Sequence, residues 1–307
     1  MKEIIAATRD LTKIYGSTEA LVHMNLNVKR GQILGLIGDN GAGKTTLLKM
    51  LAGQIYPTRG EITLFGAHGE KELEKQRKRI GTMIESPGFY PQMSVEGNLE
   101  YYRIQKGIPG KEKVAEILKA TGLYEKRRVP ARKLSFGMKQ RLGLGIALMG
   151  EPELLLLDEP INGLDPSGIM EIREMLRRLS REKNIAVILS SHILTELEQL
   201  ADKYCFLNKG KVLKQISAED LEDECSSYIE IQVSDPGLFA VRMEKRYPDQ
   251  KYQVLPDRRI RIQGEEIEPE RYSSLAAENG IQVSSLAVKS ITLEEYYMDL
   301  KRGGGQS

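Results

Sequence analysis

"GDNGAGKT", residues 38–45, decides the fold of this chain. It matches the pattern G-x-x-x-x-G-K-S/T in full, after an apolar stretch, "QILGLIG" (32–38), and before leucines at helical spacing in "KTTLLKMLAG" (44–53). The pattern therefore predicts a strand, a phosphate-binding loop and a helix. The glycines let backbone N–H groups face phosphates, Lys44 can reach the β- and γ-phosphates, and the Thr45 hydroxyl can bind Mg²⁺.

The same alternation of apolar strand and amphipathic helix continues along the chain. Apolar runs occur at 79–86, 152–160 and 184–192, and a helix between the last two carries its apolar side chains on one face. Unbroken apolar strands separated by such helices favour an α/β fold with a parallel sheet covered on both sides.

Two acids follow the strand "LLLL" directly, at Asp158 and Glu159. In an open α/β sheet, ligands bind beyond the carboxyl ends of the strands, so both carboxylates should face the nucleotide. Asp158 can hold the Mg²⁺ shell, and Glu159 can take a proton from the attacking water. A surface pair at a helix start is the alternative.

His192 ends the next strand, "NIAVILSSH" (184–192), and should lie at the same edge of the sheet. A histidine there can donate a hydrogen bond to a γ-phosphate oxygen, although a single histidine at a strand end is also compatible with an ordinary satisfied polar group.

Composition excludes several classes of protein. The 307 residues suffice for about two domains, and 45 basic against 43 acidic residues give no reason to expect a nucleic-acid partner. Two cysteines without metal-type spacing argue against a disulfide scaffold or a zinc site. We expect no signal peptide and no membrane span, because the first residues are charged and no apolar run approaches about 20 residues.

The pattern changes after residue 217, so we predict domains at 1–217 and 218–307. "YIEIQV" (228–233) alternates as a strand, and Asp235 and Pro236 are typical of a helix start. The following segments predict the order βαββαβ with a terminal helix whose Glu295 completes a capping box, typical of a small ferredoxin-like α+β domain.

"LSFGMKQRL", residues 134–142, has no lysine-bearing loop of its own, yet it leads into a helix as an anion site does. Together with "GDNGAGKTT", "LLLLDEP", "NGLDP" and His192, in this order, it resembles the ATP-binding subunit of an ABC transporter over about residues 3–215. "IESPGFYPQMSVEGNLEYY" (84–102) and the C-terminal "ITLEEYYMDL" (291–300) are similar to the bacitracin-efflux and lantibiotic-immunity type.

This resemblance implies a fold and a partner. The fold would be a P-loop NTPase, the ABC nucleotide-binding domain, with a helical subdomain. Two such domains would meet head to tail, so that Ser135 and Gly137 contact the ATP bound by the partner's Lys44. A single copy of each motif implies a second chain, most simply an identical one. An ordinary helix N-cap at Ser135 is the alternative.

The remaining site residues also follow from the resemblance. Tyr15 would stack on adenine, Asp165 would cross the dimer interface, and Glu85 would bind Mg²⁺ or orient water. Glu85, Phe136 and Met138 depart from the commoner residues at their positions, and the acid at 85 adds a carboxylate near Asp158 and Glu159. The predicted nucleotide contacts within the first loop and helix are Gly38, Asn40, Gly41, Gly43, Lys44, Thr45 and Thr46.

The predicted function is that of an ATPase motor for a separate transmembrane permease, using ATP and Mg²⁺ at the cytoplasmic face of the membrane. The surface from Glu85 through "SPGFYPQMSVEGNL" is the expected docking site, and export of antimicrobial peptides rests on the subgroup resemblance. The alternative is a soluble ABC ATPase that acts as a nucleotide-switched binding protein. A P-loop kinase or GTPase is disfavoured, because neither explains residues 134–142.

Overall fold

The glycine-rich loop joins strand β3 (Ile33–Ile37) to helix α1 (Lys44–Leu51) in the computed structural model, as the sequence predicts. The structure describes residues 2–85, 88–194, 197–198, 200–225, 227–263 and 268–303. The chain divides into two units, 1–218 and 219–302, and each is described by itself.

A six-stranded sheet forms the centre of the first unit, in the order β10-β9-β3-β8-β7-β6. β3 pairs in parallel with β8 and β9, β7 pairs in parallel with β6 and β8, and only the edge strand β10 of this sheet is antiparallel. The strands β3, β7 and β8 are buried along their whole length, as expected of a covered parallel sheet. The bounds of the other strands are β6 (Ile80–Met83), β7 (Leu154–Leu157), β8 (Ala186–Ser191), β9 (Lys203–Asn208) and β10 (Lys211–Ser217).

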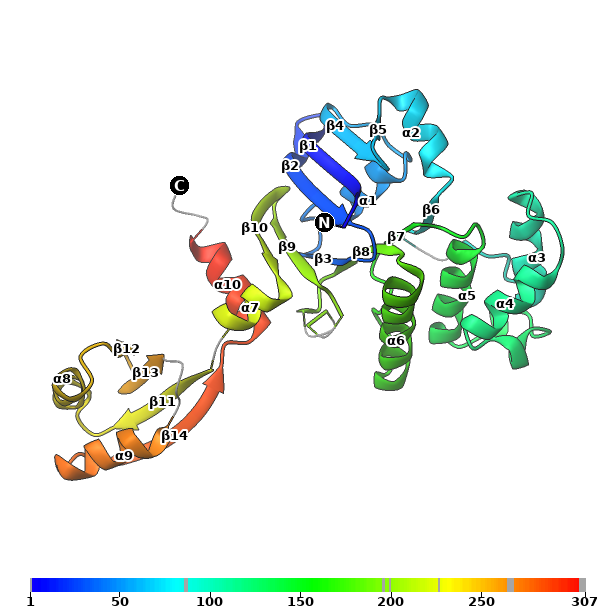
Figure 1. Ribbon diagram of the computed structural model, residues 1–307. Coiled ribbons are helices and arrows are strands. Elements are labelled where there is room, and N and C mark those ends of the chain that lie inside the picture. Colours follow the sequence, from blue (N-terminus) through cyan, green and yellow to red (C-terminus); the bar gives the residue numbers. More distant parts are fainter. Residues whose placement is uncertain are drawn as a thin grey trace. The chain divides into compact units, whose positions relative to one another are not determined.

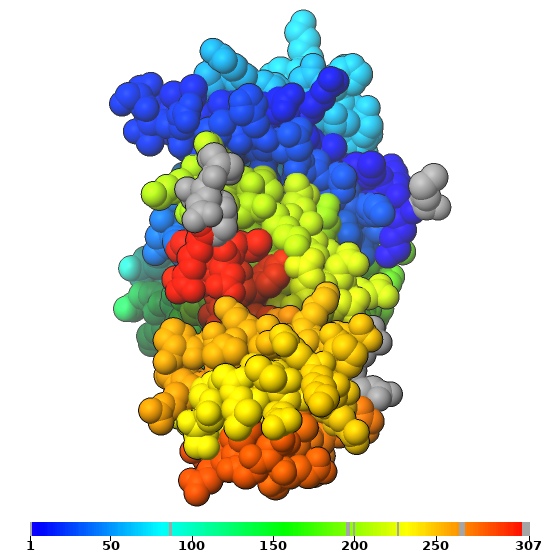
Figure 2. Space-filling model, turned by 90° about the vertical axis from the view of Figure 1, so that its left-hand side faces the viewer, coloured from blue at the N-terminus to red at the C-terminus, as the bar shows by residue number. Residues whose placement is uncertain are grey.

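A second, antiparallel sheet in this unit was not predicted. Its order is β2-β1-β4-β5, with β1 at Ile4–Tyr15, β2 at Thr18–Lys29, β4 at Arg59–Leu64 and β5 at Ala67–His68. Its apolar side chains join α1 and the central sheet in one core that includes Leu26, Leu47 and Leu156. The residues of this sheet and of α2 (Glu70–Arg77), blue to cyan, gather together in the space-filling view (Figure 2).

The predicted helical subdomain consists of α3 (Val95–Gln105), α4 (Glu112–Ala120) and α5 (Phe136–Leu148), which contact one another (Figure 1). Serines cap two of these helices: Ser94 Oγ accepts from Gly97 N, and Ser135 Oγ accepts from Met138 N. Short 3₁₀ turns at Tyr124–Lys126 and Ala131–Lys133 connect α4 to α5, and α6 (Pro166–Lys183) follows β7.

The second unit has the predicted βαββαβ order. Its antiparallel sheet runs β12-β13-β11-β14, and Ile231, Phe239 and Leu275 are among the residues that form its core. Thr292 and Glu295 exchange hydrogen bonds through their side chains and backbone N–H groups, which is the predicted capping box. The elements from residue 218 onward are α7 (Ala218–Glu224), β11 (Ser227–Val233), α8 (Pro236–Arg246), β12 (Lys251–Val254), β13 (Arg259–Gln263), α9 (Pro269–Glu278), β14 (Val283–Ser290) and α10 (Leu293–Gly303).

Among the described residues, no helix combines the length and the apolar character needed to cross a membrane. Part of the predicted docking surface, Ser86 and Pro87, lies outside the described residues.

Candidate functional site

The phosphate loop is held in place by glycines that approach the backbone of other strands. Gly43 has a φ of +103°, and a Cβ added there would lie 2.6 Å from the carbonyl oxygen of Ala20. A Cβ on Gly38 would lie 2.7 Å from the carbonyl oxygen of Leu207. Only glycine fits this course of the chain, because a side chain would collide with backbone atoms that cannot move aside.

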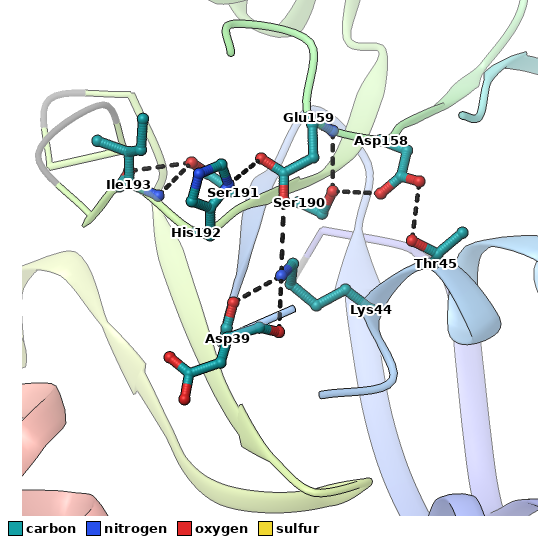
Figure 3. Close-up of polar contacts among 10 residues, drawn as sticks. Asp39, Lys44, Thr45, Asp158, Glu159, Ser190, Ser191, His192 and Ile193 are labelled. Atoms are coloured by element: carbon teal, nitrogen blue, oxygen red, sulfur yellow. Dashed lines mark hydrogen bonds and ion pairs between the residues drawn. The ribbon is translucent and has the colours of Figure 1, made fainter. Parts of the chain in front are cut away.

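Lys44 is buried at the first position of α1, with 5% of its surface exposed. Its Nζ donates to the carbonyl oxygens of Gly38, at 2.6 Å, and Asp39, at 3.2 Å, and lies 3.5 Å from Oε1 of Glu159 (Figure 3). The ammonium group is therefore fixed inside the curve of its own loop, where a bound phosphate would meet it.

Asp158 follows β7 and is also buried. Its Oδ2 accepts a hydrogen bond of 2.8 Å from Thr45 Oγ1, and its Oδ1 accepts one of 2.6 Å from Ser190 Oγ. A carboxylate beside a hydroxyl is an oxygen donor set that suits Mg²⁺, which keeps several waters and substrate oxygens in its shell. The described residues hold no group of three or more His, Cys, Asp or Glu that could bind a metal without such help.

Glu159 connects Lys44 to His192. Its Oε2 lies 2.8 Å from Nδ1 of His192, while its Oε1 faces Lys44. Its backbone has a φ of +49°, a conformation that is uncommon for residues other than glycine and is often found at functional sites. Two of the predicted catalytic groups, Glu159 and His192, are thus in direct contact.

Ser190 is a site residue that the sequence analysis missed. It is fully buried in β8, accepts a hydrogen bond of 2.9 Å from Glu159 N, and donates to Asp158. One hydroxyl therefore positions both acids from the neighbouring strand. The available signal was a serine within an apolar strand, two residues before the histidine.

The other predicted residues of the loop and first helix lie where the sequence places them. Asn40 and Gly41 are exposed on the loop, Gly41 with a φ of +82°, while Thr46 is half-buried in the first turn of α1.

Five further predicted site residues make their contacts outside this cluster. Tyr15, 48% exposed at the end of β1, has the Lys13 ammonium 4.9 Å from its ring centre. Glu85, after β6, forms an ion pair of 2.5 Å with Lys49 instead of meeting Asp158 or Glu159. Ser135 caps α5, whose first turn contains Gly137, and Asp165 caps α6 through a hydrogen bond from Gly168 N. Their roles toward a nucleotide stay predictions.

The fold and the clustered Lys44, Thr45, Asp158 and Glu159 define a phosphate-loop NTPase with a helical subdomain. A family model described as ABC transporter matches residues 21–162. The bacitracin transport ATP-binding protein BcrA of Bacillus licheniformis is 42% identical over 98% of each chain. The lantibiotic transport ATP-binding protein SrtF of Streptococcus pyogenes is 37% identical over 70% of this chain and 93% of its own.

Solved structures agree with this assignment. CbiO1 of Clostridium perfringens, described as part of the ABC transporter complex cbiONQ, is 28% identical and covers 80% of this chain and 97% of its own with a TM-score of 0.67. A dimeric ATP-binding cassette, MJ0796, bound to ADP and Pi, is 25% identical and covers 70% of this chain and 99% of its own with a TM-score of 0.64. The chain belongs to the ABC transporter family and is an ATP-hydrolysing subunit that powers transport. The predicted family and fold class are confirmed.

Proposed function

We propose that two copies of this chain bind a separate transmembrane permease at the cytoplasmic face of the membrane and drive the export of an antimicrobial peptide of the bacitracin type. The observation that carries the ATPase part is the contact of Lys44, Glu159 and His192 at the carboxyl ends of the central strands. The similarity to BcrA, which extends over 98% of both chains, supports the choice of cargo.

In the proposed site, ATP phosphates bind along the loop from Gly38 to Thr46. Lys44 exchanges its carbonyl partners for the β- and γ-phosphate oxygens, which its ammonium can contact as a compact charge. Thr45 and Asp158 would hold Mg²⁺, which supplies charge neutralisation at the phosphates when it is bound. Tyr15, exposed at a strand end, offers its ring to the adenine.

Glu159 acts in this proposal as the general base. Its carboxylate accepts a proton from the attacking water, and His192 keeps the carboxylate oriented and donates toward the γ-phosphate. Ser190 fixes the backbone from which Glu159 projects. Glu85 is held by Lys49 in the described state, and it reaches the site only after that ion pair opens.

The proposed dimer explains Ser135 and Gly137. Within the described residues, the Ser135 hydroxyl bonds to its own helix, and the helix start is free to face a second molecule. A head-to-tail arrangement places this positive helix end on the ATP of the partner, with Asp165 at the interface. Opening and closing of the two copies then moves the permease as a rigid-body switch.

Bacitracin resistance tests the proposal. In a host deleted for the gene, the wild-type chain should restore growth in bacitracin, while Glu159→Gln, expressed to the same level, should not. Normal resistance in the Glu159→Gln strain, with the purified variant inactive in ATP hydrolysis, would separate hydrolysis from export and reject the proposed function. A matched substitution at an exposed acid of α6, Glu182→Gln, should behave as the wild type does.

A further inference from the structure

A hollow of about 380 Å³ lies at the end of the central sheet where the strands begin. Gln32 precedes β3, Asn184 precedes β8 and Asp202 precedes β9, and all three residues line this hollow. The phosphate loop and His192 follow the opposite ends of β3 and β8. The hollow is therefore a separate place in the first unit, and the ATP site described above makes no use of it.

Three cations line the hollow: Lys2, Lys29 and Arg181. Asp202 supplies a single opposing charge among the described lining residues, and its Oδ2 already accepts a hydrogen bond of 2.8 Å from Ile33 N. In the described part of the chain, no acidic side chain forms an ion pair with any of the three cations.

The charged residues next to the hollow differ from its three cations in their surroundings. Arg30, one residue after Lys29, forms ion pairs with Glu3 and Glu153. Lys203, which is half-buried next to Asp202, has its pKa lowered first by burial and further by the charge of Lys29. Positive charge thus exceeds negative charge here, with three cations against the single carboxylate of Asp202, and a bound anion would reduce the repulsion between the cations.

The walls of the hollow are fixed by buried contacts. Ser180 Oγ donates a hydrogen bond of 3.1 Å to the carbonyl oxygen of Gly31, and Ser180 is 2% exposed. Gly31 has a φ of +61°, and a Cβ there would lie 3.1 Å from the Ser180 carbonyl oxygen. A ligand would enter a cavity whose backbone is already ordered, so little conformational entropy would be lost on binding.

We propose that this hollow binds a small soluble anion that carries a diphosphate group. Its volume lies within the range of about 300–1,000 Å³ that is usual for small-molecule sites. The planar guanidinium of Arg181 can contact two oxygens of one phosphate, and the ammonium groups of Lys2 and Lys29 match the remaining charge. Three cations against the Asp202 carboxylate leave a net charge of +2 in the lining, which exceeds what a monovalent anion requires and favours a diphosphate.

Calorimetric titration with inorganic pyrophosphate tests the proposal. The full chain carries Lys44→Ala, so that the phosphate loop does not contribute. We expect one site per chain, with affinity that falls as salt rises. Adding Lys29→Gln and Arg181→Gln should weaken it at least ~10-fold, because two charge-assisted contacts are lost. Both side chains are exposed, so the thermal unfolding temperature should not fall.

The matched control adds Lys71→Gln and Arg128→Gln, which remove the same two residue types from exposed positions outside the hollow. This control should retain the affinity. No binding at millimolar pyrophosphate, or equal loss in the control, would overturn the proposal. Binding to phosphatidic acid vesicles without binding to free pyrophosphate would overturn it too, because the ligand would then be a lipid headgroup. None of these results depends on whether the chain exports a peptide.

Discussion

His192 and Glu159 are joined by a contact of 2.8 Å between Nδ1 and Oε2, across two neighbouring parallel strands. Lys44 approaches the other oxygen of the same carboxylate. A carboxylate held at both oxygens has a fixed direction, which is what a general base requires for its proton transfer.

Replacing Glu159 by glutamine should keep the shape of the site and remove the base. We expect ATP turnover to fall ~10²- to 10⁴-fold while ATP remains bound. Phosphate release measures the first effect, and equilibrium binding of labelled ATP measures the second. Near wild-type hydrolysis would show that another group takes the proton.

Replacing Lys44 by alanine should abolish ATP binding at millimolar nucleotide, since the buried ammonium group within the loop is lost. Binding of a fluorescent ATP analogue tests this directly. Lys71→Ala, at an exposed position of α2, is the control and should bind normally. Retained binding by Lys44→Ala would contradict the phosphate-loop assignment.

Replacing Ser135 by arginine should prevent the ATP-dependent dimer but leave ATP binding by the monomer intact. Light scattering on a Glu159→Gln background measures the dimer. Mixed with Lys44→Ala chains, Ser135→Arg should recover partial ATPase activity, because one composite site of the mixed dimer carries both changes and the other carries neither. Loss of ATP binding by the Ser135→Arg monomer would mean that the segment serves its own chain.

Replacing Ser190 by alanine should lower kcat more than it raises KM for ATP. We expect a fall in kcat of ~10-fold, because Glu159 N and Asp158 lose the hydroxyl that positions them. Thr121→Ala removes another buried hydroxyl, one that donates to the carbonyl oxygen of Ile117, and controls for lost stability. Equal kcat values for Ser190→Ala and Thr121→Ala would show that Ser190 has only a structural role.

Acid should destabilise the second unit through Glu230. Hydrogen bonds from Lys289 and Arg259 lower the pKa of this buried carboxyl below its ordinary 4.5. Its contribution to stability is therefore complete above pH 4.5 and is lost as the pH falls through the lowered folded-state pKa. Glu230→Gln should reduce the free energy of unfolding by about 1–3 kcal/mol at neutral pH and flatten the acid dependence.

Hydrogen exchange of β11, followed by mass spectrometry between pH 3 and 7, measures this effect within the second unit. Glu270→Gln, at an exposed position of α9, should leave both the protection and its pH dependence unchanged. An unchanged profile in Glu230→Gln would show that the ion pairs contribute nothing there.

The parallel strands and the clustered acids could be predicted because each depends on local pattern. β7 is a run of four leucines that ends at Asp158, so both its burial and its functional end are visible in the sequence. The antiparallel sheet was missed although the second half of β2 alternates, with Met24, Leu26 and Val28 buried. An alternating strand carries a weaker apolar signal than the unbroken runs of β3, β7 and β8, which dominate this part of the sequence.

Contacts between distant segments could not be predicted in the same way. Ser190 and Glu159 meet because β7 and β8 are neighbours in the sheet, which no local spacing specifies. The ion pair of Glu85 with Lys49 likewise depends on how the chain leaves β6. The spacing of the motifs indicates which residues lie at the same edge of the sheet. Which strands are neighbours, and where each side chain points, is known only from the folded structure.

The Ser135 hydroxyl that caps the start of α5 acts there as an acceptor, and the cap does not use its hydrogen. A serine hydroxyl has two acceptor lone pairs and one hydrogen. Ser135 Oγ uses one lone pair to accept the hydrogen bond from Met138 N. In the proposed dimer this hydrogen would be donated to an oxygen of the ATP bound by the second molecule, so that one hydroxyl would serve both helix capping and subunit recognition. Aspartate would cap the start of the helix equally well but would repel a triphosphate, whereas alanine could neither cap the helix nor donate a hydrogen bond. Helix capping alone allows several residues at position 135, whereas the proposed contact with a second molecule favours one that also donates a hydrogen bond.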